Sequence, residues 1–113
     1  MAKTVADFSA FLALDIRVGT IVAAVPAQTK KPTYRMTVDF GGDIGTRVSC
    51  GAYTNYAQEE LIGKQVVAVL NFGIKKMGPE VSEALILGVK SPDGVGTLLL
   101  TVDKHAVTGS EVF

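Results

Sequence analysis

The sequence predicts an all-β fold, a small closed barrel of five strands with one helix in front and a short helix between the third and fourth strands. Three observations predict it. Short segments rich in Val, Ile, Leu and Thr recur between turn signals such as GGDIG and SPDG. Residues Tyr34–Phe40 alternate between apolar and polar side chains. Hydrophobic residues make up 48% of the 113 and charged residues 19%, which is typical of a single globular domain, here residues 1–113.

The N-terminal half is expected to form a helix followed by three strands. Phe8, Phe11 and Leu12 recur at the i, i+3, i+4 spacing of one helix face, which predicts a short helix within Val5–Leu14. The strands are expected at Arg17–Val25, with Gly19 as a bulge or bend, at Tyr34–Phe40 after a loop bracketed by Pro26 and Pro32, and at Thr46–Cys50.

The C-terminal half is expected to supply the short helix and the remaining strands. A helical turn is predicted at Tyr56–Leu61 and ends at Gly63. Gln65–Phe72 is apolar on both faces, which indicates a strand buried on both sides. Further strands are expected at Ala84–Val89 and Thr97–Val102, with a C-terminal extension after them. This order matches the oligonucleotide/oligosaccharide-binding (OB) barrel, in which closure removes exposed sheet edges.

The charges exclude a strong overall field. Eleven basic and eleven acidic residues cancel, so no net charge attracts nucleic acid or an anionic membrane. The basic residues are clustered, however. Residues 17–38 and 61–79 contain no acid but hold seven basic residues, which are Arg17, Lys30, Lys31, Arg35, Lys64, Lys75 and Lys76. If these segments fold together, they form a basic face on a neutral protein.

Several functional classes lack support in the sequence. The single cysteine, Cys50, cannot form an internal disulfide or a metal site and is expected to be a small buried thiol. The only histidine, His105, has no partnered motif, and no phosphate-binding loop motif is present. Asp7 and Asp15 interrupt the apolar character of the N-terminus, and no apolar run approaches the ~20 residues of a membrane span. We therefore expect a cytoplasmic binding protein, not an enzyme, without cofactor, metal or membrane insertion.

The stretch NFGIKKMGPEVSEALILGV raises the main question about binding. Lys75, Lys76 and Met77 precede a Gly-Pro turn between two apolar segments. They form either the rim of a binding surface or a solvated hairpin tip. Met77 has a flexible side chain that fits varied partners, although it could equally plug the mouth of the barrel.

Other candidate binding residues come from aromatic and polar positions. Tyr53, Tyr56 and Phe72 offer flat faces for base stacking, although packing in the core or between subunits is favoured for Phe72. Arg35 lies on the polar face of its strand and, with Lys30 and Lys31, is a surface candidate, whereas Tyr34 is expected in the core. Asn71 could present its amide to a peptide backbone or cap a turn.

Four segments, in this order along the chain, resemble the tRNA-binding domain family. They are DIRVGTIV (15–22), EELIGKQVVAVLNF (59–72), KKMG (75–78) and SEALILGV (82–89), and the resemblance covers roughly Phe8 to Phe113. Within this family the chain is most similar to small free-standing, export-related chaperones. The resemblance implies an OB-fold barrel that is extended at both ends and forms a homodimer. It also places Ser49 and Ser82 near the binding face, where a hydroxyl can donate to a phosphate or a carbonyl.

The resemblance implies two functions. The first is a secretion chaperone that binds unfolded preproteins or extended peptides in a cleft of a homodimer, with Phe8, Phe11, Phe72 and Phe113 at the subunit contact. The alternative is a free-standing protein that binds tRNA by its structure through a basic face. The family's usual Lys-Met-Arg-Gly is Lys-Met-Gly-Pro here, at residues 76–79, so one basic residue of the tRNA pattern is missing. Residues 48–53 read VSCGAY where tRNA binders of the family read Val-Ser-Gly, and both departures disfavour the tRNA reading. A docking module for a synthetase is a third hypothesis.

Overall fold

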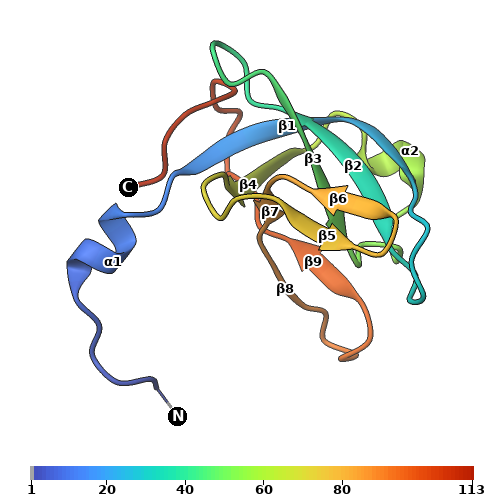
Figure 1. Cartoon of the computed structure of the whole chain (residues 1–113), viewed down its shortest axis with the longest axis horizontal. Coiled ribbons are helices and arrows are strands. Elements are labelled where there is room, and N and C mark those ends of the chain that lie inside the picture. The colour runs from blue at the N-terminus through green and yellow to red at the C-terminus, as the bar shows by residue number, and fades with distance from the viewer. Residues whose placement is uncertain (1) are drawn as a thin grey trace.

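The computed structural model describes residues 2–113 and shows a curved five-stranded sheet that nearly closes into an OB-type barrel (Figure 1). The strand order is β3-β2-β1-β4-β7 and the pairs are antiparallel. Two small hairpins, β5–β6 and β8–β9, extend from this sheet. The elements are α1 (Phe8–Leu12), β1 (Ile16–Pro26), β2 (Tyr34–Asp39), β3 (Thr46–Gly51), α2 (Gln58–Leu61), β4 (Gln65–Val69), β5 (Lys75–Met77), β6 (Glu80–Ser82), β7 (Leu85–Ile86), β8 (Gly88–Lys90) and β9 (Thr97–Leu99).

The long strand β1 joins the two halves of the sheet. Its first half pairs with β4 and its second half with β2, and the β2 register shifts between Ile21 and Ala23. The bulge is therefore at Val22, and the expectation of a bulge at Gly19 is wrong. Gly19 instead allows close packing, because a Cβ there would lie 2.5 Å from Cγ1 of Val38.

The core lies inside the curved sheet. In β2 and the residue after it, Met36, Val38 and Phe40 are buried, whereas Arg35 is exposed, as the alternating pattern predicted. Ile21 of β1 and Leu61 of α2 are also fully buried and complete the centre. Burial of each of these large side chains contributes about 1.5–3 kcal/mol, which explains why the alternation fixes the register of β2.

The barrel is closed between β3 and the segment that follows β5–β6. The backbone N–H of Glu83 donates to the carbonyl of Val48 at 2.7 Å, and the N–H of Ile86 donates to Oγ of Ser49 at 3.4 Å. Individual backbone and side-chain hydrogen bonds therefore close this seam, where β3 and β7 are not paired in a β ladder. The hydroxyl of Ser49 belongs to the barrel wall.

Several elements are shorter than the sequence predicted. The front helix covers only the five residues Phe8–Leu12 and begins after Asp7, whose carboxylate accepts from the N–H of Ser9 at 3.0 Å. The expected strand Ala84–Val89 is split, because the chain leaves β4 after Leu87 and pairs with β9 from Gly88 onward. Residues 75–82 form a separate hairpin, β5–β6, which was not among the expected strands.

The two terminal segments differ in how they meet the start of β1. The backbone of Gly109–Val112 exchanges hydrogen bonds of 2.7–2.9 Å with Ile16 and Val18, on the part of β1 that β2 does not cover. The N-terminal segment with α1 projects away from the barrel on the same side as the C-terminus (Figure 1). Among residues 2–113, no helix has both the length and the apolar character that crossing a bilayer requires.

Candidate functional site

A groove of about 700 Å³ lies between the β1–β2 loop and the tip of the β5–β6 hairpin. The end of β3 forms its floor. Most of the lining groups are apolar or belong to the backbone, and two lysines lie among them. The lining residues are Gln28, Thr29, Lys30, Lys31, Pro32, Thr33, Cys50, Gly51, Ala52, Met77, Gly78 and Pro79.

The hairpin wall is formed by a two-residue turn. Met77 pairs with Glu80 across it, and Gly78 at the first turn position has a φ of 65°, which favours glycine over residues with a side chain. Pro79 at the second position restricts the backbone further. The half-buried Met77 therefore lies on the wall of an open groove, so the alternative that it plugs the barrel does not hold.

The opposite wall is the β1–β2 loop, which is closed by its own hydrogen bonds. The N–H of Ala27 donates to the carbonyl of Thr33 at 2.9 Å, and the hydroxyl of Thr33 donates to the carbonyl of Lys31 at 2.9 Å. This geometry leaves Lys30 and Lys31 exposed at the groove. Within residues 2–113 only Arg17 and Arg35 form ion pairs, so both ammonium groups retain their charge toward solvent and the groove.

A buried carboxylate connects the two walls. Oε2 of Glu80 accepts from the N–H of Gln28 at 2.8 Å, and both carboxylate oxygens accept from Nη1 of Arg35 at 3.1 and 3.2 Å. The hydrogen bond from Gln28 and then the one from Arg35 lower the pKa of Glu80 below its usual value. Because this pair balances the charge of Arg35, Lys30 and Lys31 dominate the potential of the groove.

Cys50 lies on the groove and is half-buried, so the expectation of a buried thiol is only partly right. Its Sγ lies 3.7 Å from the carbonyl oxygen of Val81. Burial, followed by the negative charge of Glu80, raises the pKa of the thiol, while Arg35 acts in the opposite direction. The thiol is therefore protonated near neutral pH, and a reactive cysteine is not expected.

A second hollow of about 570 Å³ shares Lys31, Pro32 and Ala52 with the groove. It ends at the β8–β9 turn, where Asp93 accepts from the hydroxyl of Ser91 and from the N–H groups of Val95 and Gly96. These hydrogen bonds lower the pKa of Asp93. The two adjoining hollows therefore present lysines at the β1–β2 loop and a carboxylate at the β8–β9 turn.

Three of the predicted site residues are buried in the barrel. Tyr53 is only 4% exposed and its hydroxyl donates to the carbonyl of Ile86 at 3.2 Å, so the expectation that its ring stacks on a base is wrong. The hydroxyl of Ser82 accepts from the N–H of Cys50 and donates to the carbonyl of Ala84. Ser49 is 1% exposed. Both serines are therefore buried and hydrogen-bonded within the barrel, and the expectation that their hydroxyls contact a ligand is wrong.

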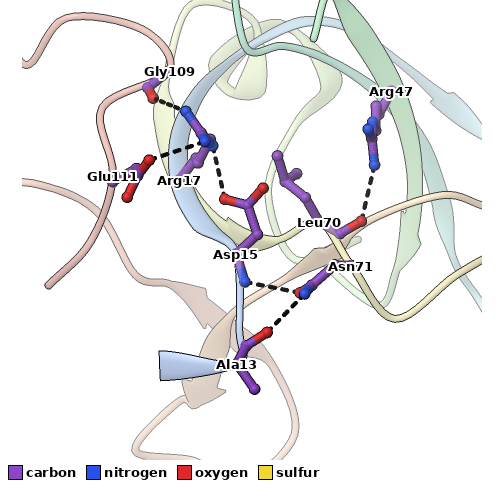
Figure 2. A network of polar contacts seen from close by, with 8 residues as sticks. All are labelled: Ala13, Asp15, Arg17, Arg47, Leu70, Asn71, Gly109 and Glu111. Carbon is purple, nitrogen blue, oxygen red and sulfur yellow. Dashed lines mark hydrogen bonds and ion pairs between the residues drawn. The ribbon is translucent and has the colours of Figure 1, made fainter. Parts of the chain in front are cut away.

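Asn71 is exposed but its amide is already engaged (Figure 2). Its Oδ1 accepts from the N–H of Asp15, and its Nδ2 donates to the carbonyl of Ala13, both at 2.8 Å. The side chain therefore anchors the segment that follows α1. Of the two expected roles, the local capping role describes this geometry, and the contact with a peptide backbone does not.

Lys75 and Lys76 are exposed on β5 but are not among the residues that line the groove. Lys75 instead lines a separate hollow of about 430 Å³ with Phe72, Ile74 and Leu85. The structure thus brings Met77, Lys30 and Lys31 together and places the β5 lysines elsewhere. Arg35 lies beside the groove, where it pairs with Glu80.

The residues predicted for a subunit contact are largely exposed. Phe8, Phe72 and Phe113 are 68%, 62% and 107% exposed, and the half-buried Phe11 stacks on Phe8 at 5.8 Å between ring centroids. In Figure 2, Arg17 donates to Asp15, to the carbonyl of Gly109 and to Glu111, which ties the C-terminal segment to the start of β1 beside the anchored N-terminal segment.

Sequence reasoning missed Glu80 and the two prolines of the groove. Glu80 is 45 residues from Arg35 and 52 from Gln28, so no local pattern indicates its partners. Pro32 and Pro79 look like ordinary turn residues in the sequence. Their apolar rings become a surface feature only because the barrel brings the loop and the hairpin together.

Comparison with known protein families gives one match over most of the chain. The family described as "Putative tRNA binding domain" matches residues 16–111. The methionine–tRNA ligase of Parabacteroides distasonis is 37% identical over 94% of this chain, and that of Methanocaldococcus jannaschii is 34% identical over 94%. The chain spans only 15% and 16% of the length of these two relatives.

Solved structures of similar size cover nearly the whole chain. The CsaA chaperone of Picrophilus torridus is 35% identical, with a TM-score of 0.90 and coverage of 96% of this chain and 100% of that one. The CsaA chaperone of Bacillus anthracis is also 35% identical, with a TM-score of 0.89 and coverage of 97% and 100%. The fold is therefore similar to that of these two chains over nearly their whole length.

Proposed function

The chain belongs to the tRNA-binding domain family, and from that premise we propose that it is a chaperone that binds unfolded preproteins in extended form, as a homodimer in the cytoplasm. It acts by binding and not as an enzyme. The observation that carries the proposal is the groove of about 700 Å³, which combines the apolar surfaces of Met77, Pro32 and Pro79 with the free charges of Lys30 and Lys31.

This surface is suited to extended peptides of varied sequence. A Met side chain and proline rings provide apolar contact area without demanding one partner shape. Such contacts depend little on the identity of the peptide's side chains, which suits clients of varied sequence. The similarity to chains described as CsaA chaperones supports this reading over the other functions in the family.

The homodimer in this proposal uses the exposed phenylalanines. All five residues of α1 keep part of their surface exposed, and Phe72 and Phe113 lie near the segments that anchor α1 and the C-terminus. An exposed apolar surface of this kind marks a protein interface. A second copy of the chain covers it in a two-fold arrangement, in which each protomer gives and receives the same contacts.

Titration of a labelled, unfolded preprotein segment tests the proposed function. We expect saturable binding at micromolar concentration, followed by fluorescence anisotropy. Met77→Ser removes apolar contact from the groove wall and should weaken binding about tenfold, which corresponds to ~1.4 kcal/mol. Val107→Ser is the matched control, because Val107 is 79% exposed on the C-terminal segment outside the groove. Equal effects of both substitutions, or no saturable binding, contradict the proposal.

A tRNA-binding role is the alternative, and one observation favours it. Lys75 and Lys76 are exposed on β5, outside the groove and free of ion pairs among residues 2–113. Phosphate contacts give log K a salt slope of about −0.9 per phosphate, so tRNA binding by this face weakens steeply as salt rises. A titration with total tRNA at increasing salt separates the functions. Tight binding with a steep slope, abolished by Lys75→Ala with Lys76→Ala, supports tRNA binding.

A further inference from the structure

Glu80 is a buried acidic residue at the point where the hairpin meets the barrel. Its side chain is 6% exposed, and its carboxylate accepts from the backbone of Gln28 and from the guanidinium of Arg35. Burial of a carboxylate is costly unless hydrogen bonds and an opposite charge compensate it. The three hydrogen bonds of 2.8–3.2 Å provide that compensation here.

These hydrogen bonds connect elements that are distant in the sequence. Gln28 begins the loop that carries Lys30 and Lys31, while Glu80 directly follows Pro79 at the hairpin tip. Arg35, the third partner, belongs to β2. The carboxylate thus joins the cationic wall of the groove to the wall that carries Met77.

The other hydrogen bonds of the loop act within the loop. Ala27 donates to Thr33, and the hydroxyls of Thr29 and Thr33 donate to the carbonyl of Lys31. They fix the loop's shape but not its distance from the hairpin. The distance between the walls therefore depends on Glu80.

We propose that Glu80 is a positioning residue that holds the two walls of the groove at the separation required by a bound peptide. The inference rests on the proposed peptide-binding function and names the residue that preorganises that site. A groove with fixed walls binds a flexible peptide more tightly, because less ordering of the protein opposes binding.

The test compares Glu80→Ala with Glu83→Ala. Glu83 is the matched control, because it is a carboxylate near the same hairpin whose Oε1 accepts from the N–H of Val48 at 3.0 Å, away from the loop. Hydrogen exchange of residues 28–33 and titration with the labelled preprotein segment are measured for both variants. For Glu80→Ala we expect loop exchange about tenfold faster and peptide affinity about tenfold weaker, equivalent to ~1.4 kcal/mol. For Glu83→Ala we expect loop exchange and affinity within about twofold of the wild type.

Glu80→Gln provides a rescue test that keeps the size of the side chain. Its amide oxygen can still accept from Gln28, so we expect loop protection and affinity between those of the wild type and Glu80→Ala. Affinity of Glu80→Ala within about twofold of the wild type, or unchanged loop exchange, overturns the inference. If the wild type binds no peptide, the proposed function fails, while the exchange measurement alone still decides whether Glu80 joins the walls.

Discussion

At the scale of single residues, the side chain of Tyr53 links the barrel core to β7. Its ring is buried among core residues, and its hydroxyl donates to the carbonyl of Ile86 in β7. A Cβ at Gly88 would collide with the same hydroxyl, so only glycine fits at the first position of β8. The tyrosine thus packs against the place where the chain leaves β7 and starts β8.

The burial of Tyr53 predicts a loss of stability in alkali. Burial raises the pKa of its hydroxyl from 10.0 to about 12. The unfolded chain therefore releases this proton first, and the folded state loses up to about 2–3 kcal/mol of stability as pH rises from 10 through 12. Tyr53→Phe should cost about 1 kcal/mol at neutral pH because the carbonyl of Ile86 loses its donor. The substitution should also reduce the loss of folding stability between pH 10 and pH 12, because it removes the titrating hydroxyl.

Urea unfolding at about pH 9 and pH 11.5 measures this difference for the wild type and Tyr53→Phe. The wild type should lose more stability between the two pH values than the variant does. Tyr56→Phe serves as a control, because the hydroxyl of Tyr56 accepts from the N–H of Leu99 and its ring is only half-buried. If the wild type and Tyr53→Phe lose equal amounts of stability between the two pH values, Tyr53 is not the cause of the loss.

Cys50 provides a natural probe of the groove. Because burial and the charge of Glu80 raise its pKa above the ordinary 9.0, the thiolate fraction near pH 8 is small and alkylation should be slow. We expect the rate with iodoacetamide to rise steeply above about pH 9, and a saturating unfolded peptide to slow it further. The urea-unfolded chain, in which the thiol is fully exposed, is the control. If the folded protein reacts as fast as the unfolded chain at pH 8, the pKa of Cys50 is not raised by its surroundings in the fold.

At the scale of elements, the β1–β2 loop and the β5 strand carry separate lysine pairs. Lys30 and Lys31 line the groove, whereas Lys75 and Lys76 do not. For a peptide that carries acidic residues, Lys30→Ala with Lys31→Ala should weaken binding about three- to tenfold at low salt, because two exposed charges contribute about 0.7–1.4 kcal/mol. Lys75→Ala with Lys76→Ala removes the same charge and should change binding by less than about twofold. Similar effects of the two pairs on peptide titration argue against the groove as the binding site.

The elements also show which parts of the fold the sequence can predict. The alternation of β2 and the apolar character of β4 reflect burial by neighbouring strands, so both were predicted within a few residues. The split between β7 and β8 was not, because it depends on how Gly88 meets Tyr53, 35 positions earlier. The same holds for the site. The sequence indicated the lysines and Met77 as candidate binding residues. It did not show that the lysines lie on two separate surfaces, or that Glu80 joins the groove walls, because both depend on tertiary contacts.

At the scale of the whole molecule, polar contacts anchor the segments that carry the exposed phenylalanines to the start of β1. Asn71 anchors the segment after α1, and Arg17 binds the C-terminal segment through Glu111 and Gly109 (Figure 2). Phe72 is adjacent to Asn71, and Phe113 is two residues after Glu111. The network therefore fixes the segments that carry the apolar side chains, which reduces the ordering cost of an interface built from them.

This arrangement predicts that the chain is a dimer and that α1 is required for it. We expect the wild type to have about twice the 11.9 kDa mass of one chain in sedimentation equilibrium at micromolar concentration. Phe8→Ser with Leu12→Ser removes two large exposed side chains from α1, which are 68% and 66% exposed, and should shift the protein to the monomer. Because the two side chains lie on the surface of one chain, the fold of the monomer should be retained, as judged by the urea midpoint of the diluted protein.

Val95→Ser is the matched control, because Val95 is 84% exposed on the β8–β9 turn, and it should leave the mass unchanged. A wild-type mass equal to one chain, or a dimer that survives both substitutions in α1, contradicts the proposed subunit contact.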